Sequence, residues 1–129
     1  MLDSNIVGPL MNSNTRVRKR YNAILGSAAI SVIVLSELLY GIAKSKNRKA
    51  NTLGLDRLLQ SGLLVAAFTE DDAATAGTLR ATLAAGGDVM AQNDLLIAAQ
   101  ALRVGATLVT AGSDFARVDG LITEDWSKP

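Results

Sequence analysis

The sequence predicts an α/β fold in which a parallel β-sheet is flanked by helices, an α/β/α sandwich formed by a single domain of residues 1–129. Short apolar runs alternate with longer amphipathic segments, a pattern typical of parallel strands joined by right-handed crossovers. Hydrophobic residues make up 49% of the chain and aromatic residues only 4%. The core is therefore expected to consist of Ala, Leu, Ile and Val, and the chain is long enough to bury it.

Short apolar runs predict the strands. The first strand is very short and centred on Leu2, and the others are expected at residues 28–31, 63–67, 107–110 and 121–122. Side chains that follow parallel strands gather at one edge of the sheet, which is where sites form in such folds.

Four helices are expected in the first half of the chain. A first helical segment begins at Asn5 and is interrupted near Gly8 and Pro9. An amphipathic helix follows at residues 15–25, and further helices are expected at residues 33–44 and 50–60.

Two more helices are expected in the second half. Thr69 is a good N-cap, followed by three acids in a first helical turn, and this helix runs to the Gly86–Gly87 pair. Asn93 is expected to cap a helix at residues 94–103, and residues 113–116 form a short helical turn.

Two absences narrow the chemistry. Without cysteine, the chain has no disulfide, thiol nucleophile or cysteine-ligated metal. Without histidine, it has no Ser-His-Asp mechanism and no histidine metal site. Any catalysis must therefore use carboxylates, Lys, Tyr or backbone groups.

The net charge is only +1, but the basic residues are clustered. One cluster comprises Arg16, Arg18, Lys19 and Arg20, and the other comprises Lys44, Lys46, Arg48 and Lys49. These clusters form either a surface for nucleic-acid phosphates or ordinary solvated helix faces. The chain shows neither a signal peptide nor an apolar run long enough to span a bilayer, so we expect a cytoplasmic protein without a membrane partner.

Four acids stand in settings that favour a functional role. Asp3 ends an apolar strand, although an N-cap is the alternative role for it. Glu37 is the only charge between Arg20 and Lys44, in a helix that is apolar nearly all round. A buried lone carboxylate costs several kcal/mol unless it is paired or bound to metal.

Asp94 opens a helix, where the helix dipole keeps a carboxylate ionised. Asp114 follows a strand, although a turn former is the alternative. Together with Asp3 and Glu37, these acids are expected to converge on one edge of the sheet. Oxygen ligands suit Mg²⁺ or Mn²⁺, and the natural chemistry of such a site is phosphodiester hydrolysis.

Four blocks, in order along nearly the entire chain, resemble PIN domains. Residues 2–6 are similar to the opening L-D-T-N-I/V of these domains, and residues 30–41 to their I-S-x-x-T-x-x-E-L-x-x-G. Residues 93–99 are similar to N-D-x-x-I-A-A, and residues 108–126 to the closing L-V-T…F…G-L…D-W. The resemblance is strongest to VapC-type toxins of bacterial type II toxin–antitoxin systems.

The resemblance assigns metal-binding and catalytic roles to Asp3, Glu37 and Asp94. It makes Ser4, Asn5 and Asn93 the polar groups that support these ligands. Many relatives carry an acid or asparagine where this chain has Gly112, which leaves Asp114 as the nearby candidate for a fourth ligand.

The resemblance further implies a Mg²⁺- or Mn²⁺-dependent endoribonuclease that cleaves RNA and is inhibited by a VapB-like antitoxin. A tRNA is a candidate substrate, as it is for some relatives. The resemblance also implies a homodimer or a larger toxin–antitoxin assembly. The alternatives are a non-toxin PIN nuclease of RNA processing and a catalytically silent RNA-binding or interaction module. A phospho-acceptor domain has less support, because no well-placed lysine occurs late in the chain.

Overall fold

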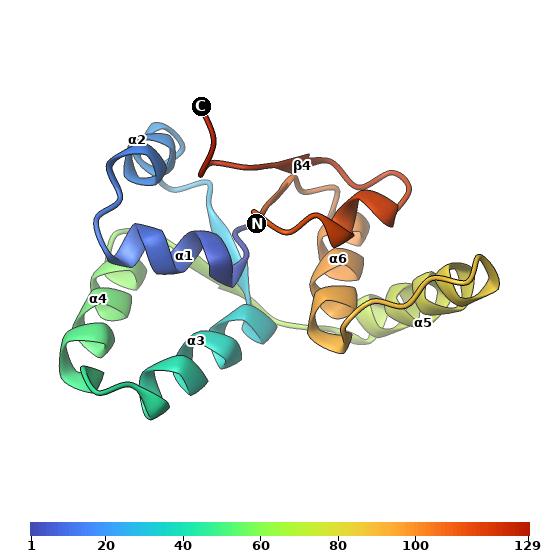
Figure 1. Ribbon diagram of the computed structural model, residues 1–129, viewed down its shortest axis with the longest axis horizontal. Helices are drawn as coiled ribbons and strands as arrows, with labels where there is room; N and C mark the ends of the chain where they lie inside the picture. Colours follow the sequence, from blue (N-terminus) through green and yellow to red (C-terminus); the bar gives the residue numbers. More distant parts are fainter.

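The computed structural model describes all residues from 1 to 129, and it confirms the parallel strands flanked by helices (Figure 1). Strands β1 (Ala29–Ser31) and β2 (Leu64–Ala66) form one parallel pair. Strands β3 (Leu108–Val109) and β4 (Thr123–Glu124) form a second parallel pair.

The first three residues of the chain connect the two strand pairs. The backbone N–H of Leu2 donates to the carbonyl of Ala29 at 2.8 Å, and Leu2 forms a parallel bridge with Val109. The N–H of Asp3 also donates to the carbonyl of Val109, at 2.9 Å. The segment predicted as a first strand therefore lies between β1 and β3, and its last residue, Asp3, emerges at the sheet edge.

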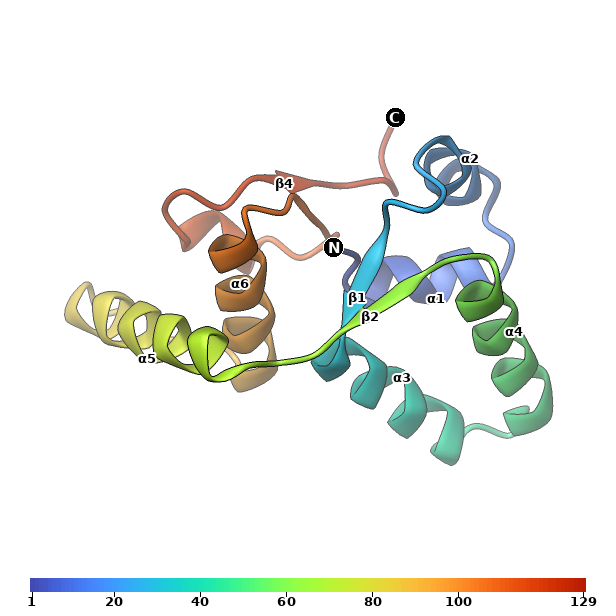
Figure 2. The same cartoon turned by 180° about the vertical axis from the view of Figure 1, so that it is seen from behind.

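The helices form two groups, which both views of the ribbon show (Figures 1 and 2). The first group comprises α1 (Ser4–Met11), α2 (Thr15–Ala23), α3 (Val32–Lys44) and α4 (Arg48–Gln60). The second comprises α5 (Glu70–Ala85), α6 (Gln92–Val104) and the short 3₁₀ helix η1 (Asp114–Arg117). None of these helices combines the length and apolar character needed to cross a membrane.

Most of the core is aliphatic, as the composition predicts. It is completed by three aromatic residues: Tyr21, Phe115 and Trp126. Helix α1 buries Ile6, Val7 and Leu10 completely.

The expected interruption of the first helix at Gly8 and Pro9 is wrong, since α1 runs through both residues. A proline inside a helix removes one backbone hydrogen bond. The buried apolar face of α1 keeps the helix in place despite that loss.

Among the element boundaries that differ from expectation, two affect residues considered below. The last strand is at residues 123–124, because Leu121 still belongs to a turn in which its N–H donates to the carbonyl of Val118 and Gly120 has a φ of 82°. Helix α6 begins at Gln92, with Ala91 as its N-cap, so Asn93 does not cap it. The Asn93 side chain lies against a neighbouring acid instead, as described below.

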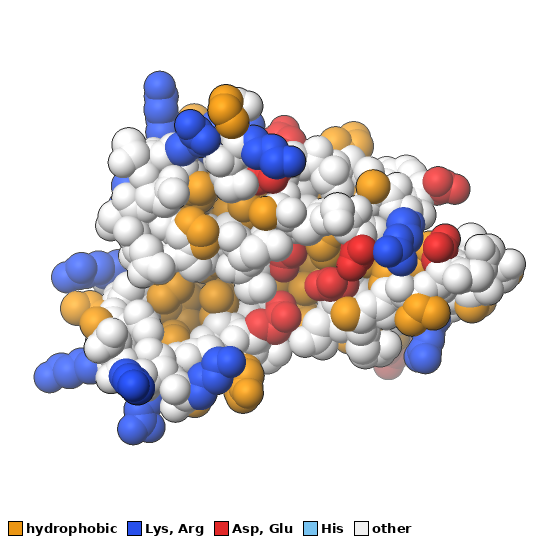
Figure 3. Space-filling model, in the orientation of Figure 1, with side chains coloured by type: hydrophobic (Ala, Val, Ile, Leu, Met, Phe, Trp, Pro, Cys, Tyr) orange, Lys and Arg blue, Asp and Glu red, His pale blue; other side chains and the backbone are white.

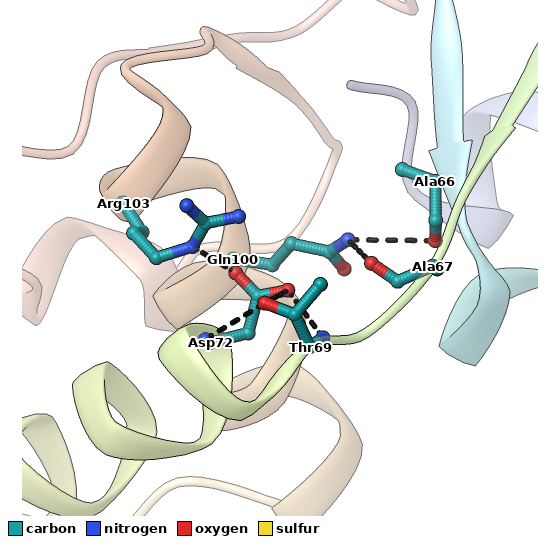
Figure 4. Close-up of polar contacts among 6 residues, drawn as sticks. All are labelled: Ala66, Ala67, Thr69, Asp72, Gln100 and Arg103. Carbon is teal, nitrogen blue, oxygen red and sulfur yellow. Dashed lines mark hydrogen bonds and ion pairs between the residues drawn. The ribbon is translucent and has the colours of Figure 1, made fainter.

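A polar network joins β2, α5 and α6 (Figure 4). Asp72 is fully buried; it accepts hydrogen bonds from the backbone and hydroxyl of Thr69 and is ion-paired with Arg103 of α6. The amide of Gln100 donates to the carbonyl of Ala67 at 3.0 Å. These contacts fix the chain between β2 and α5 against α6.

Candidate metal-dependent active site

Asp3 is a buried carboxylate held from two sides. Its Oδ1 accepts a hydrogen bond from the N–H of Ser4 at 2.8 Å, so it also caps α1, the alternative role considered from the sequence. Its Oδ2 accepts from the hydroxyl of Thr110 at 2.8 Å. These two donors fix the carboxylate at the carboxyl end of the strands.

Thr110 is the support that the sequence analysis missed as a site residue. Besides donating to Asp3, its hydroxyl oxygen accepts from the N–H of Gly112 at 2.9 Å and from the amide of Asn5 at 3.3 Å. Asn5 in turn accepts from the N–H of Ala111 at 3.1 Å. The available signal was the threonine within the closing motif, which directly follows β3.

Gly112 is part of this support and leaves little room for a side chain. A Cβ there would lie 3.3 Å from the hydroxyl oxygen of Thr110 and 3.3 Å from the ring of Phe115. A larger residue would therefore press on the hydroxyl that holds Asp3.

Glu37 lies in the second turn of α3 and, with Asp3 and Asp94, forms the group of acids called the acidic pocket. Burial raises its pKa, the negative charges of Asp3 and Asp94 raise it further, and the polar side chains of Asn93 and Ser4 offset part of the rise. One of its oxygens, Oε1, is buried without a hydrogen-bond partner. A buried carboxylate oxygen without a partner in the chain is suited to bind an ion or an ordered water.

Asp94 approaches from the first turn of α6. Burial raises its pKa, and the charges of Asp3 and then Asp114 add to the rise. Asp3, Glu37 and Asp94 thus come from three separate segments and act on one another electrostatically.

Asp114 is less enclosed than the other acids. Its side chain is 52% exposed, and it is ion-paired with Arg117 at 2.9 Å, within η1. It nevertheless lies close enough to influence Asp94. The structure therefore places it at the outer edge of the acidic pocket.

The donor set fits a hard divalent cation. All candidate ligands are carboxylate oxygens, which Mg²⁺ and Mn²⁺ prefer, and Glu37 offers an oxygen that nothing else satisfies. No three of the acids already lie close enough together to hold one ion. The acids are nevertheless close enough for their like charges to add to the effect of burial in raising the pKa values of Glu37 and Asp94.

The two basic clusters are used differently. Around α2, Arg16 donates to the carbonyl of Ser127 at 3.0 Å, and Arg18 donates to that of Leu10 at 3.1 Å. Part of this cluster therefore holds the fold together. In the other cluster, Lys44 stacks on Tyr40 with its nitrogen 4.9 Å from the ring centre.

Acidic and basic side chains separate on one face of the molecule. Figure 3 shows acids across its middle, with most of the basic side chains over α2 and around the α3–α4 turn. A polyanion that approaches the acidic side chains would be attracted by the basic side chains over α2 and around the α3–α4 turn.

Comparison with known proteins agrees with this geometry. The PIN domain family matches residues 1–121. The chain is 39% identical to Ribonuclease VapC2 of Rickettsia felis, an alignment that covers 99% of this chain and 98% of the relative. It is 36% identical to the tRNA(fMet)-specific endonuclease VapC of Shigella flexneri, over 98% of this chain and 97% of the relative.

Solved structures agree in fold. The structure of VapBC2 from Rickettsia felis bound to a promoter DNA fragment contains a chain that superposes with a TM-score of 0.90 at 37% identity, covering 98% of this chain and 97% of that one. DNA-bound VapBC from Salmonella typhimurium gives a TM-score of 0.91 at 31% identity, covering 98% and 96%.

Proposed function

The chain belongs to the PIN-domain family and, within it, to the VapC ribonucleases of toxin–antitoxin systems, and we propose that it hydrolyses RNA with Mg²⁺ or Mn²⁺ held by Asp3, Glu37 and Asp94. The observation that carries the metal site is the buried, unpartnered Oε1 of Glu37 beside two further carboxylates. Asp114 is the proposed fourth carboxylate at the outer edge. In this role, the chain acts as a toxin in the cytoplasm.

The polar residues around the metal ligands have supporting roles in the proposed reaction. A bound metal would supply an activated water and would neutralise charge on the phosphate that is cleaved. Thr110 and Ser4 hold Asp3 in place, so this ligand needs little reorganisation when the ion arrives. Asn93 lies close enough to Glu37 to lower its pKa.

The direct test is cleavage of total RNA by the purified protein with Mg²⁺ or Mn²⁺, followed by mapping of the new ends. We expect defined cleavage positions that disappear in excess EDTA. Cleavage that persists in EDTA would contradict the metal mechanism, and no cleavage with either ion would contradict the nuclease function.

For the substrate, we propose a tRNA. Two relatives, from Shigella flexneri at 36% identity and Salmonella typhimurium at 33% identity, are tRNA(fMet)-specific endonucleases. Sequencing of RNA ends should place the cleavage sites in one or a few tRNAs. Sites confined to ribosomal or messenger RNA would contradict this choice of substrate.

We also propose a VapB-like antitoxin as the partner. The related chains of known structure are in VapBC complexes. Helices α3 and α4 expose Leu39, Tyr40 and Leu53 by 50%, 66% and 49%, which is apolar surface for an anchor. An Arg or Lys of the partner would complete the contact by pairing with the acids in place of metal.

Co-expression with the product of an adjacent small gene tests the partner. We expect a homogeneous complex with suppressed cleavage, containing a homodimer of this chain or a larger toxin–antitoxin assembly. Replacing Leu39 and Tyr40 with Ser should weaken the complex. A neighbouring protein that neither binds nor inhibits would favour the alternative of a stand-alone RNA-processing nuclease.

A further inference from the structure

Arg117 stands apart from the other cations because of its acidic neighbour. The protein has four ion pairs, formed by Arg20, Arg103, Arg117 and Lys128 with acids. Of these four acids, only Asp114, the partner of Arg117, influences a carboxylate of the metal site. Among the paired cations, Arg117 is therefore the one whose partner, Asp114, acts electrostatically on Asp94 of the metal site.

Two contacts hold this guanidinium without covering it. One terminal nitrogen donates to Asp114 at 2.9 Å, and the other donates to the carbonyl of Val89, in the turn between α5 and α6, at 3.1 Å. A guanidinium has five N–H donors, so further donors remain available. The Arg117 side chain is 40% exposed and lines an open groove between α5, α6 and η1.

Charge explains what such a donor is suited to bind. The acidic pocket is negative, so an RNA chain crossing it gains attraction only from the metal and from cations at its borders. Basic clusters border the pocket at α2 and at the α3–α4 turn (Figure 3). Arg117 lies on η1, away from both basic clusters and beside Asp114.

From this arrangement we propose that Arg117 binds a backbone phosphate of the RNA substrate, next to the phosphate that is cleaved. The inference rests on the proposed ribonuclease function. Asp114 and the Val89 carbonyl are the groups that aim the guanidinium, and a fixed fork of donors suits a phosphate. Arg117 is thus a substrate-binding residue, and Asp114 positions it in addition to completing the acidic edge.

The test measures kcat/KM for cleavage of bulk bacterial tRNA in Mg²⁺ from 50 to 200 mM NaCl. Arg117→Gln should lower kcat/KM roughly tenfold at 50 mM NaCl and reduce the salt slope by about 0.7 to 0.9, as expected for one lost phosphate contact. Arg117→Lys should keep most of the salt slope, because the positive charge remains. It should lose part of kcat/KM, because an ammonium lacks the planar, bidentate donors of a guanidinium. Arg80→Gln is the matched control: Arg80 is exposed on α5, has no ion pair, and should behave as wild type.

A second measurement separates this role from an effect on the metal or the fold. The rise in Tm that Mg²⁺ produces should be the same in Arg117→Gln and wild type. An active wild type with unchanged kcat/KM and salt slope in Arg117→Gln would overturn the inference alone, as would a Mg²⁺-induced rise lost together with activity. A wild type without Mg²⁺-dependent cleavage would instead overturn the proposed function, and this inference with it.

Discussion

Asp72 is fully buried and Glu37 is partly buried, and the surroundings of the two carboxylates shift their pKa values in opposite directions. Burial of Asp72 favours its neutral form, but Arg103 and the two donors of Thr69 outweigh burial and lower the pKa (Figure 4). At Glu37, burial and neighbouring acids raise the pKa, and one oxygen has no partner.

Helix α6 takes part in both regions and supplies opposite charges to them. Its first turn brings Asp94 to the acidic pocket, while its last turn brings Arg103 to Asp72. Both positions agree with the helix dipole, which favours an anion at the start and a cation at the end. The comparison teaches that burial of an acid alone does not mark a site, because Asp72 is fully buried and paired with a cation, whereas Glu37 lies among like charges.

The largest expected effect is that of Asp94→Asn on catalysis. The substitution keeps the size of the side chain and removes the charge that a cation requires. Supporting groups around metals cost about 10- to 100-fold when removed, so loss of a ligand should lower cleavage at least about 100-fold. Circular dichroism should show an intact fold. Full metal-dependent cleavage by a folded Asp94→Asn protein would refute the assignment of this acid.

Asp72→Ala should affect stability instead of chemistry. It leaves the N–H of Thr69 and the guanidinium of Arg103 without their partner. Because the Arg103 side chain is 33% exposed and reaches water, we expect a loss of about 2 to 3 kcal/mol, less than for a fully buried pair. Urea unfolding measures this loss, and cleavage per folded molecule should persist.

The neighbouring substitution Asp71→Ala provides the control for this experiment. Asp71 is exposed in the same helical turn, so its removal should cost less than about 1 kcal/mol. Equal losses for the two variants would show that the helix dipole, not the buried network, accounts for the role of Asp72.

The sequence predicted most of the elements, since apolar periodicity is a local property, and it named three acids whose charges act on one another in the structure. The predicted first strand at Leu2 and the helix carrying Glu37 agree with the structure. The sequence did not separate Asp72 from Glu70 and Asp71, because all three fit the first turn of a helix. Only the packing of α6 against α5 decides which of them is buried.

The same limit applies to Thr110 and Asp114. The hydroxyl of Thr110 reaches Asp3 across 107 positions of the chain, a contact that no local pattern contains. Asp114 could be named as a candidate acid from the sequence. Its ion pair with Arg117 depends on how η1 winds after Gly112, so the proposed link between this acid and an RNA-binding arginine emerged only from the structure.

Magnesium should stabilise the wild-type protein and not Glu37→Gln. At a Mg²⁺ concentration ten times its Kd, binding adds about 1.4 kcal/mol, which corresponds to a Tm rise of about 4 °C for a domain of this size. Removing the unpartnered Glu37 carboxylate should abolish most of that rise. Asp72→Ala should retain it from a lower starting Tm. A full Mg²⁺ effect in Glu37→Gln would place the ion elsewhere.

The smallest expected effects concern pH, and they have opposite signs in the two regions. The lowered pKa of Asp72 contributes stability that is present above the unfolded value of about 3.9 and is lost as pH falls through the folded pKa. Asp72→Asn should therefore be less stable than wild type at neutral pH, with the difference shrinking in acid.

The raised pKa of Glu37 means that its ionised form lowers the free energy of unfolding. This loss of stability is absent below the unfolded value of about 4.3 and grows as pH rises through the folded pKa. Glu37→Gln should thus be more stable than wild type at pH 7 in EDTA, and the two should converge near pH 4. Urea unfolding from pH 3 to 8 in EDTA measures both differences. Differences of the same sign would mean that the surroundings of Asp72 and Glu37 do not shift the two pKa values in opposite directions.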